Sequence, residues 1–261
     1  MGAVPGGKGP ASRPRSEAYY REDCAMYFYD DQALNAYLSH DSVAWAITHW
    51  SRPADPPLVC QQWLEHSSAK RLIFYHMYGD LLGLWGRLSE GQRVLDVGGG
   101  MTALTRALAG RHAYDLIDVM AHDSGEAVEN MLGTLPRYVW LAEDWNAYEP
   151  DRTWDIIIAN DLFPNVDQRL ERFLNKYLPV CREMRLSLTT YDNGRFYRVR
   201  RTAGEEIMWM AAWDARQTRE VMAPYRRYID GPFPEVWPGT AGALFDNGRQ
   251  IAAVTLRGGK A

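Results

Sequence analysis

The sequence has few residues of the kinds that hold metal ions or form disulfides. Its 261 residues include three cysteines, Cys24, Cys60 and Cys181, which are far apart and form no Cys-x-x-Cys pair. The six histidines show no His-x-His or His-x-x-x-His spacing. We therefore expect neither a disulfide framework nor a metal site, and the free thiols indicate the reducing cytoplasm as the location.

Long apolar runs and an excess of positive charge are also missing. No apolar run approaches the roughly 18 residues of a membrane-spanning helix. The 29 Lys and Arg residues are outnumbered by 33 Asp and Glu, so the net charge of −4 gives no global basic field for nucleic acid. Residues 1–17 are rich in Gly, Pro and basic residues, which predicts a disordered leader and not a signal peptide. The expected partner is a small molecule, with no nucleic acid and no membrane, and a homodimer is left open.

The abundant residue types predict two segments after this leader. Apolar residues make up 46% of the chain, with ten Trp and fifteen Tyr, which is enough for a sizeable core. Residues 18–90 have apolar side chains at helical spacing, as in "DDQALNAYLSHDSVAWAITHW", where Asp30 or Asp31 is a plausible N-cap. In residues 91–261, short apolar strands alternate with amphipathic helices, which predicts βαβ units around a parallel sheet. We expect an α/β fold in which residues 18–90 form a helical lid.

The C-terminal part of the chain has a different pattern. The stretch "TAGEEIMWMAAWDARQTREVMAPYRRY" indicates helix, at least in part. The stretch "GALFDNGRQIAAVTLRGG" has two apolar arms around Asn247 and Gly248, a dipeptide typical of a type I′ turn. We therefore expect the mostly parallel sheet to end in an antiparallel C-terminal hairpin.

Three consecutive glycines, Gly98, Gly99 and Gly100, separate an apolar strand from a helix in "RVLDVGGGMTALTRALAG". Such a loop lets a ligand approach the backbone N–H groups closely, as both dinucleotides and S-adenosylmethionine (SAM) do. Asp96 favours SAM, because a carboxylate repels a pyrophosphate but attracts the α-ammonium and sulfonium groups of SAM. A helix cap is the alternative interpretation of Asp96.

Polar residues follow each of the next three predicted strands. Asp118 ends the second strand, where its carboxylate could accept hydrogen bonds from both ribose hydroxyls. Glu143 and Asp144 end the third, where one acid could accept from the adenine amino group while the other faces solvent; we favour Asp144. Asn160 and Asp161 end the fourth, at the mouth of the expected site. Open α/β sheets bind ligands at the carboxyl ends of their strands, so these residues predict one continuous site.

From about Arg93 to Gly259 the chain resembles the class I SAM-dependent methyltransferases. The resemblance covers the "DVGGG" loop, the acid Asp118, the "AED" ending at Asp144 and the "WDIIIAND" strand. Thr102 departs from the family pattern, because many members have a third glycine there, but Thr is a competent helix cap. The resemblance implies a Rossmann-like sheet, a variable helical lid and SAM as the cosubstrate.

The expected reaction is methyl transfer to a nitrogen of a small polar metabolite, such as an amino acid or a related amine or guanidine. Asn160 and Asp161 are the catalytic candidates, because their oxygens can orient N–H groups, and Asn160 also lies beside SAM. Tyr197, in "GRFYRVRR", and Tyr20, in "YYREDCAMYFY", are further candidates that could contact the acceptor or the sulfonium. Each candidate has a structural alternative: Asn160 and Asp161 could shape the turn before Pro164, and Tyr197 could belong to a solvated strand face. Tyr20 could belong to a helix whose aromatic residues pack in the core.

Two other functions stay open on the sequence. Azetidine-2-carboxylate synthases resemble the same family, but in them the amine of SAM attacks its own γ-carbon and methylthioadenosine is released. The residues above would serve that cyclisation equally well, and the products separate the two reactions. A methyltransferase-fold binding protein without activity is the third hypothesis, which the retained acids Asp96, Asp118 and Glu143-Asp144 disfavour.

Overall fold

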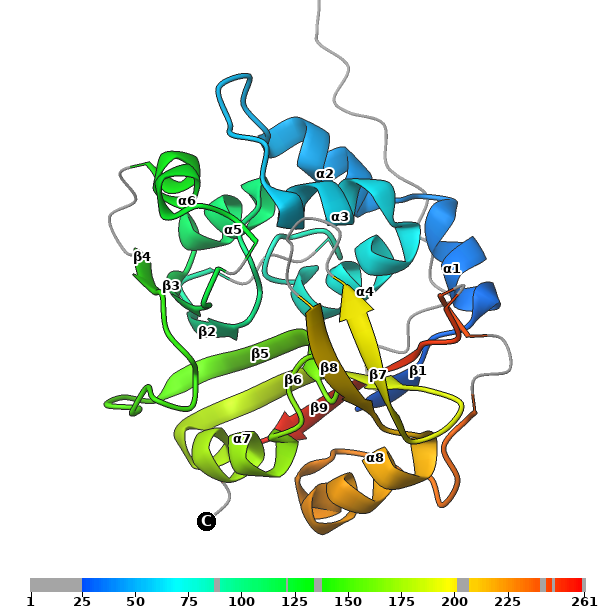
Figure 1. Ribbon diagram of the computed structural model, residues 1–261. Coiled ribbons are helices and arrows are strands. Elements are labelled where there is room, and N and C mark those ends of the chain that lie inside the picture. Colours follow the sequence, from blue (N-terminus) through cyan, green and yellow to red (C-terminus); the bar gives the residue numbers. More distant parts are fainter. Residues whose placement is uncertain are drawn as a thin grey trace, which may run out of the picture.

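A seven-stranded sheet with the strand order β1-β9-β6-β5-β2-β3-β4 forms the centre of the molecule (Figure 1). The computed structural model describes residues 25–86, 90–120, 122–133, 138–200, 207–239, 243–245 and 247–259. The strands of this sheet are β1 (Met26–Phe28), β2 (Arg93–Val97), β3 (Ala113–Ile117), β4 (Tyr138–Leu141), β5 (Trp154–Phe163), β6 (Cys181–Thr190) and β9 (Gln250–Arg257). Strands β2 to β6 pair in parallel, and β9 is antiparallel to both β6 and β1. The expected α/β fold with a mostly parallel sheet is therefore confirmed.

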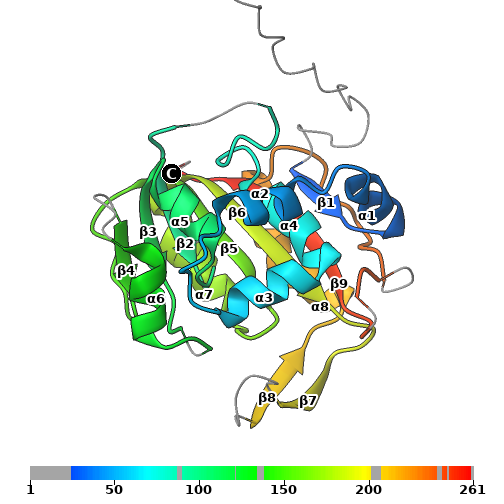
Figure 2. The same cartoon turned by 90° about the horizontal axis from the view of Figure 1, so that it is seen from above.

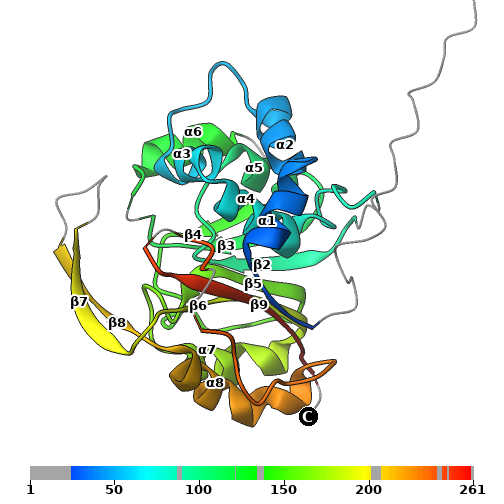
Figure 3. The ribbon, with the colours of Figure 1, turned by 90° about the vertical axis from the view of Figure 1, so that its right-hand side faces the viewer.

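Helices cover both faces of this sheet, as Figures 1 and 3 show. One face carries α1 (Asp31–Leu38), α2 (Ser42–Trp50), α3 (Val59–His66), α4 (Ser68–Tyr78), α5 (Ala103–Ala109) and α6 (Gly125–Leu132). The other carries α7 (Leu170–Tyr177), α8 (Ala215–Met222) and the short 3-10 helices η1 (Leu178–Val180) and η2 (Ala223–Tyr228). Each layer buries its own apolar cluster against the sheet, since burial of apolar surface is the main force that holds the layers together.

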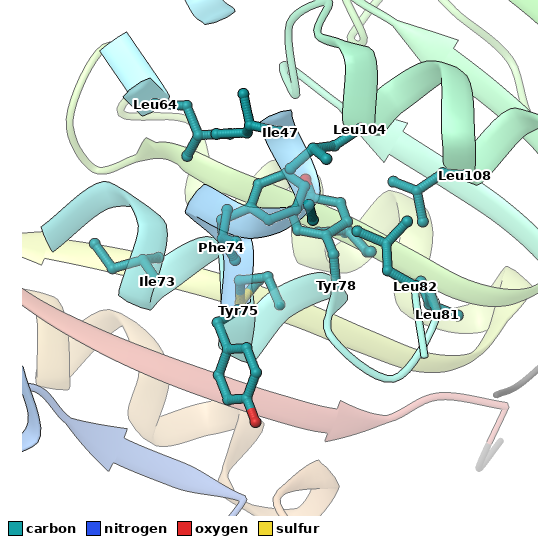
Figure 4. Packing of buried hydrophobic residues seen from close by; sticks show 14 of the residues in the cluster. Ile47, Leu64, Ile73, Phe74, Tyr75, Tyr78, Leu81, Leu82, Leu104 and Leu108 are labelled. Carbon is teal, nitrogen blue, oxygen red and sulfur yellow. The ribbon is translucent and has the colours of Figure 1, made fainter. Parts of the chain in front are cut away.

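Aromatic packing attaches α4 to the sheet beneath the glycine loop. The rings of Phe74 and Tyr78 stack with centroids 4.3 Å apart, within a cluster that also contains Leu104 and Leu108 of α5 (Figure 4). Tyr78 is 1% exposed, and its hydroxyl donates a hydrogen bond to Asp96 on β2. The core therefore fixes one of the predicted site residues directly.

Local capping explains where the first helices begin. Asp30 accepts a hydrogen bond from the Ala33 N–H and caps α1, as expected. Asp41 accepts from the Ala44 N–H and caps α2, so residues 30–50 form two helices. Asp41 also pairs with Arg71 of α4 at 2.9 Å, which ties the two helices together.

Strand pairing changes two local expectations and confirms a third, the antiparallel end of the sheet. Residues 26–28, within the aromatic cluster, form β1 and not a helix, because they pair with Ala252, Ala253 and Val254 of β9. The C-terminal stretch expected to be helical at least in part contains α8, but its residues Ile207–Ala212 form β8, because they pair with β7 (Arg195–Arg200) in a separate two-stranded sheet. Of the predicted C-terminal hairpin, the second arm is the antiparallel strand β9, whose partners are β6 and β1.

The N-terminal expectations are addressed only in part. The leader 1–17 and Tyr20 lie outside the described residues. Helices α1 to α4 confirm the helical character of residues 31–78, while β1 makes the same segment part of the main sheet. The division into a lid of residues 18–90 and a domain of residues 91–261 stays a prediction.

Candidate functional site

The glycine loop lies between β2 and α5 and leaves no room for side chains. Gly98 and Gly100 have φ angles of +70° and +67°, a left-handed conformation that glycine adopts most easily. A Cβ atom on Gly99 would overlap both carboxylate oxygens of Asp96, and one on Gly100 would lie 2.6 Å from the Cys60 Sγ of α3. The loop therefore needs glycine for close packing on both sides.

Thr102 begins helix α5, as the departure from the family pattern led us to expect. Its hydroxyl accepts hydrogen bonds from the N–H groups of Leu104 and Thr105, each at 3.1 Å. The Thr105 hydroxyl accepts in return from the Thr102 N–H, which completes a capping box. The helix thus starts immediately after the loop without a third glycine.

Asp96 is buried under this loop, with 2% of its surface exposed. The hydroxyl of Tyr78 donates to one carboxylate oxygen at 3.0 Å, and that of Tyr114 donates to the other at 2.5 Å. Burial raises the pKa of Asp96 to about 7, although both hydrogen bonds act to lower it. The structure places Asp96 against the loop as expected, and its contact with a SAM ammonium group stays a prediction.

Asp118 follows β3, and its carboxylate links the glycine loop to the segment that comes after β3. One of its carboxylate oxygens accepts from the Gly100 N–H at 2.9 Å, and the other accepts from the Met120 N–H at 2.7 Å. Burial raises the pKa of Asp118, against the effect of these two bonds. Each oxygen has a further lone pair, so ribose hydroxyls could bind without breaking either contact.

The two acids after β4 have different surroundings. Asp144 is exposed, accepts from the Asn146 N–H at 2.8 Å and forms an ion pair with Arg169 at 2.9 Å. Glu143 is half-buried. The preference for Asp144 as the adenine contact stays a prediction.

Asn160 and Asp161 lie near the end of β5 and share one hydroxyl group. The Ser187 Oγ of β6 accepts from the Asp161 N–H at 2.6 Å and donates to the Asn160 Oδ1 at 2.8 Å. Asp161 has a φ of +57°, and the pairing register of β5 with β6 shifts between Ala159 and Phe163. The Ser187 hydroxyl thus fixes the Asn160 side chain and the Asp161 backbone at this irregularity.

Two cations and an amide surround the Asp161 carboxylate. The Lys70 Nζ of α4 lies 2.9 Å from one oxygen, and an Arg249 nitrogen lies 3.2 Å from the other. The Asn165 amide donates a third bond at 3.1 Å. Burial acts to raise the pKa of Asp161, but the charges of Lys70 and Arg249 outweigh it and lower the pKa to about 2. Asp161 is therefore an ionised, paired carboxylate.

Lys70 and Arg249 are site residues that the sequence analysis missed. They are separated from Asp161 by 91 and 88 residues of the chain, and no motif marks either of them. Strand ends bring the predicted acids and Arg249 to one edge of the sheet, and Lys70 reaches Asp161 there from α4. Along that edge lie Asp144 after β4, Asp118 after β3, the glycine loop after β2, Asp161 at β5 and Arg249 before β9.

No family model matches the chain. A curated relative, malonyl-[acyl-carrier protein] O-methyltransferase 1 from Ilyobacter polytropus, is 23% identical over 109 residues, which are 41% of this chain and 41% of the relative. The matched segment therefore spans less than half the length of that protein.

Several solved structures resemble the chain at low sequence identity. DhpI in complex with SAH has 18% identity and a TM-score of 0.46, with coverage of 88% of this chain and 97% of DhpI. The 1,6-didemethyltoxoflavin-N1-methyltransferase from Burkholderia thailandensis has 14% identity and a TM-score of 0.46, with coverage of 92% and 98%. The N-methyltransferase NodS from Bradyrhizobium japonicum has 13% identity and a TM-score of 0.44, with coverage of 82% and 97%.

Of the two tyrosine candidates, Tyr197 lies in the two-stranded sheet and Tyr20 lies outside the described residues. Tyr197 belongs to β7, where its backbone pairs with Met210 of β8, in the two-stranded arm that projects from the molecule (Figure 2). Tyr191, at the base of the arm, donates from its hydroxyl to the Asn165 Oδ1 at 3.1 Å. Tyr191 is thus a site residue that the sequence analysis missed, and the roles of Tyr197 and Tyr20 stay predictions.

Within the described residues, no helix has the length and apolar character needed to cross a membrane. In the same part of the chain, no three His, Cys, Asp or Glu side chains gather in a way that could hold a metal ion.

Proposed function

We propose that the protein is a SAM-dependent methyltransferase that methylates a nitrogen atom of a small polar metabolite, such as an amino acid or a related amine or guanidine. The observation that carries this proposal is the order of groups along the carboxyl edge of β4, β3 and β2. An exposed acid, an acid bonded to the glycine loop, and the loop itself follow one another there. That order suits an adenine, a ribose and a methionine tail in turn.

The residues present fit SAM. The loop backbone carries no Cβ atoms, and its Gly98 and Gly100 N–H groups donate to the Ile117 carbonyl and to the Asp118 carboxylate, which fixes the loop in place. Asp118 retains lone pairs for the ribose hydroxyls, and Asp96 lies beneath the loop, where an approaching cation favours its ionised form. When bound, SAM supplies a methyl group that its sulfonium has already activated.

The remaining groups would orient the acceptor and exclude water. The Asn160 Oδ1 is held by the Ser187 hydroxyl and has a second lone pair for an acceptor N–H. Cys60 of α3 packs against Gly100, so this helix covers the loop from above. Exclusion of water by such a cover favours transfer of the methyl group to the acceptor.

Binding and product analysis test this proposal together. We expect S-adenosylhomocysteine (SAH) to bind the wild-type protein in isothermal titration calorimetry, and Asp118→Asn to weaken binding by about tenfold through loss of a charged hydrogen-bond acceptor. Asp155→Asn is the matched control, because Asp155 lies at the amino end of β5, on the opposite edge of the sheet, and pairs with Arg93.

The products of SAM turnover separate the competing reactions. We expect SAH to accumulate only when a panel of free amino acids is added. Methylthioadenosine formed from SAM alone would instead support cyclisation, and absence of SAH binding would contradict both reactions.

A further inference from the structure

Arg249 and Lys70 bring two positive charges to a single carboxylate. Their side chains are 12% and 29% exposed, and that of Asp161 is 27% exposed. These three charged groups sum to one excess positive charge in a largely buried place. A buried cation that exceeds its counter-charge is costly, and an anionic ligand relieves that cost.

The Arg249 guanidinium also has an unused hydrogen-bond donor. Its Nε atom is buried and, among the described residues, has no hydrogen-bond partner. The guanidinium carbon lies over the Phe245 ring, 4.1 Å from its centroid, which is a cation–π contact. Buried N–H groups of charged side chains are rarely left without an acceptor. A ligand with planar oxygens would satisfy this donor, because guanidinium matches a carboxylate in a two-point contact.

The position of Arg249 separates it from the predicted SAM contacts. Arg249 immediately precedes β9, whose residue Gln250 pairs with Thr190 at the carboxyl end of β6. In the sheet, β6 and β5 lie between β9 and the glycine-loop strand β2, whereas Asp118 and Asp144 follow β3 and β4 on the other side.

The cluster nevertheless adjoins the loop. The Leu162 side chain, next to Asp161, lies 3.3 Å from the position of a Cβ on Gly98. A molecule that extends from the methyl-transfer position toward β9 would therefore meet Arg249.

We propose that Arg249, with Lys70, binds a carboxylate group of the methyl acceptor, so that the acceptor is an amino acid and not a simple amine. This inference rests on the proposed methyltransferase function and names its substrate class. Asp161 is then a positioning residue, which holds both cations in place until the acceptor carboxylate arrives. SAM carries the same chemical group on its methionine moiety, and the experiment below distinguishes the two sources.

The test compares amino acids with their decarboxylated amines. The probes are the pairs glycine and methylamine, β-alanine and ethylamine, histidine and histamine, and arginine and agmatine. Each is titrated into the protein saturated with SAH, and the rise in melting temperature gives its affinity. We expect at least one amino acid to stabilise the wild-type complex while its amine does not. We expect Arg249→Met to weaken the binding of that amino acid by at least about tenfold.

Two further variants separate charge from geometry. Arg249→Lys keeps the charge but removes the planar pair of donors, so we expect an intermediate loss of affinity. Arg257→Met is the matched control, because Arg257 lies at the far end of β9, the strand that Arg249 precedes, and pairs with Glu183 and Asp230 away from the site. We expect it to leave the affinity for the amino acid unchanged.

Three outcomes would overturn the inference. One is that the amino acids and their amines raise the melting temperature of the SAH complex equally, or that neither raises it. Another is an equal loss of affinity for the amino acid in Arg249→Met and Arg257→Met. The third is a loss of SAH affinity in Arg249→Met with unchanged affinity for methylthioadenosine, which would assign the cation to the carboxylate of SAM. Failure of SAH to bind the wild-type protein would instead contradict the proposed function itself.

Discussion

The two halves of the carboxyl edge hold their charges in opposite ways. On the side of β2, β3 and β4, Asp96 and Asp118 receive hydrogen bonds from tyrosine hydroxyls and backbone N–H groups. On the side of β5 and β9, Asp161 is enclosed by two cations that come from distant parts of the chain. Burial raises the pKa of Asp96 to about 7 in spite of its hydrogen bonds, whereas the charges of Lys70 and Arg249 outweigh burial and lower the pKa of Asp161 to about 2. Buried carboxylates on one sheet edge can thus differ widely in proton affinity, depending on whether neutral donors or cations face them.

The largest effect should follow from filling the glycine loop on the first side. Gly99→Ala places a methyl group on the Asp96 carboxylate, which two tyrosines hold in position. We expect a loss of about 2 kcal/mol in the free energy of unfolding, as for other overpacked sites, and at least about tenfold weaker SAH binding. Urea unfolding and calorimetry measure the two effects.

Gly110→Ala is the control for this substitution. The nearest atoms to a Cβ on Gly110 are carbonyl oxygens at 3.6 Å, an ordinary contact distance. If both variants bind SAH like the wild type, the close packing beneath the loop has no part in ligand binding.

The pH dependence of stability should distinguish the acids of the two sides. Because folding raises the pKa of Asp96, the folded state holds this proton more tightly than the unfolded state. The Asp96 contribution to stability is therefore full below about pH 4 and is lost as the pH rises toward 7. Relative to Asp96→Asn, which cannot titrate, the wild type should lose on the order of 2 kcal/mol between pH 5 and pH 8.

Urea unfolding of both proteins at the two pH values measures this difference. Asp155→Asn serves as the control, because hydrogen bonds and charge from Arg93 outweigh the burial of Asp155 and lower its pKa, which moves its titration below this window. A constant difference between the wild type and Asp96→Asn would show that the Asp96 pKa is not raised by folding.

The smallest effect is expected from neutralising Asp161 on the second side. Asparagine adopts the left-handed conformation as readily as aspartate, so Asp161→Asn removes the charge without straining the backbone at φ +57°. We expect a loss of about 1 kcal/mol in the free energy of unfolding, because Lys70 and Arg249 lose a charged acceptor.

Asp230→Asn breaks an ion pair with Arg257 at 3.3 Å whose acid is 65% exposed. It should change stability by less than about 0.5 kcal/mol, since such exposed pairs contribute little. Equal effects of the two substitutions in urea unfolding would mean that the Asp161 cluster acts as an ordinary surface pair.

Local patterns made the first side of the edge predictable. The strand, the three glycines and the cap Thr102 follow one another in the chain, and so does Asp118 at the end of the next strand. Each feature depends on the dihedral angles and hydrogen bonds of near neighbours, which a single sequence records. The second side lacked such signals, because Lys70 resembles any exposed lysine of a helix and Arg249 any arginine near a turn.

Strand pairing accounts for the other differences. Residues 26–28 and 207–212 have compositions that suit a helix as well as a strand, and only their partners β9 and β7 decide between the two. The contact of Tyr191 with Asn165 was not foreseen for the same reason. The hydroxyl of Tyr191 reaches Asn165 across 26 residues of the chain, a distance that no periodicity describes.

The sequence by itself determined the parallel α/β sheet, the glycine loop and the acids at the ends of the first strands, because these depend on short-range periodicity, turn chemistry and capping. The tertiary structure alone decided which charges surround Asp161, how β1 completes the sheet and where the β7–β8 arm projects. The physical reason is that ion pairs and strand partners depend on which segments the folded core brings together. The distance between two residues along the chain does not tell whether the folded core places them side by side.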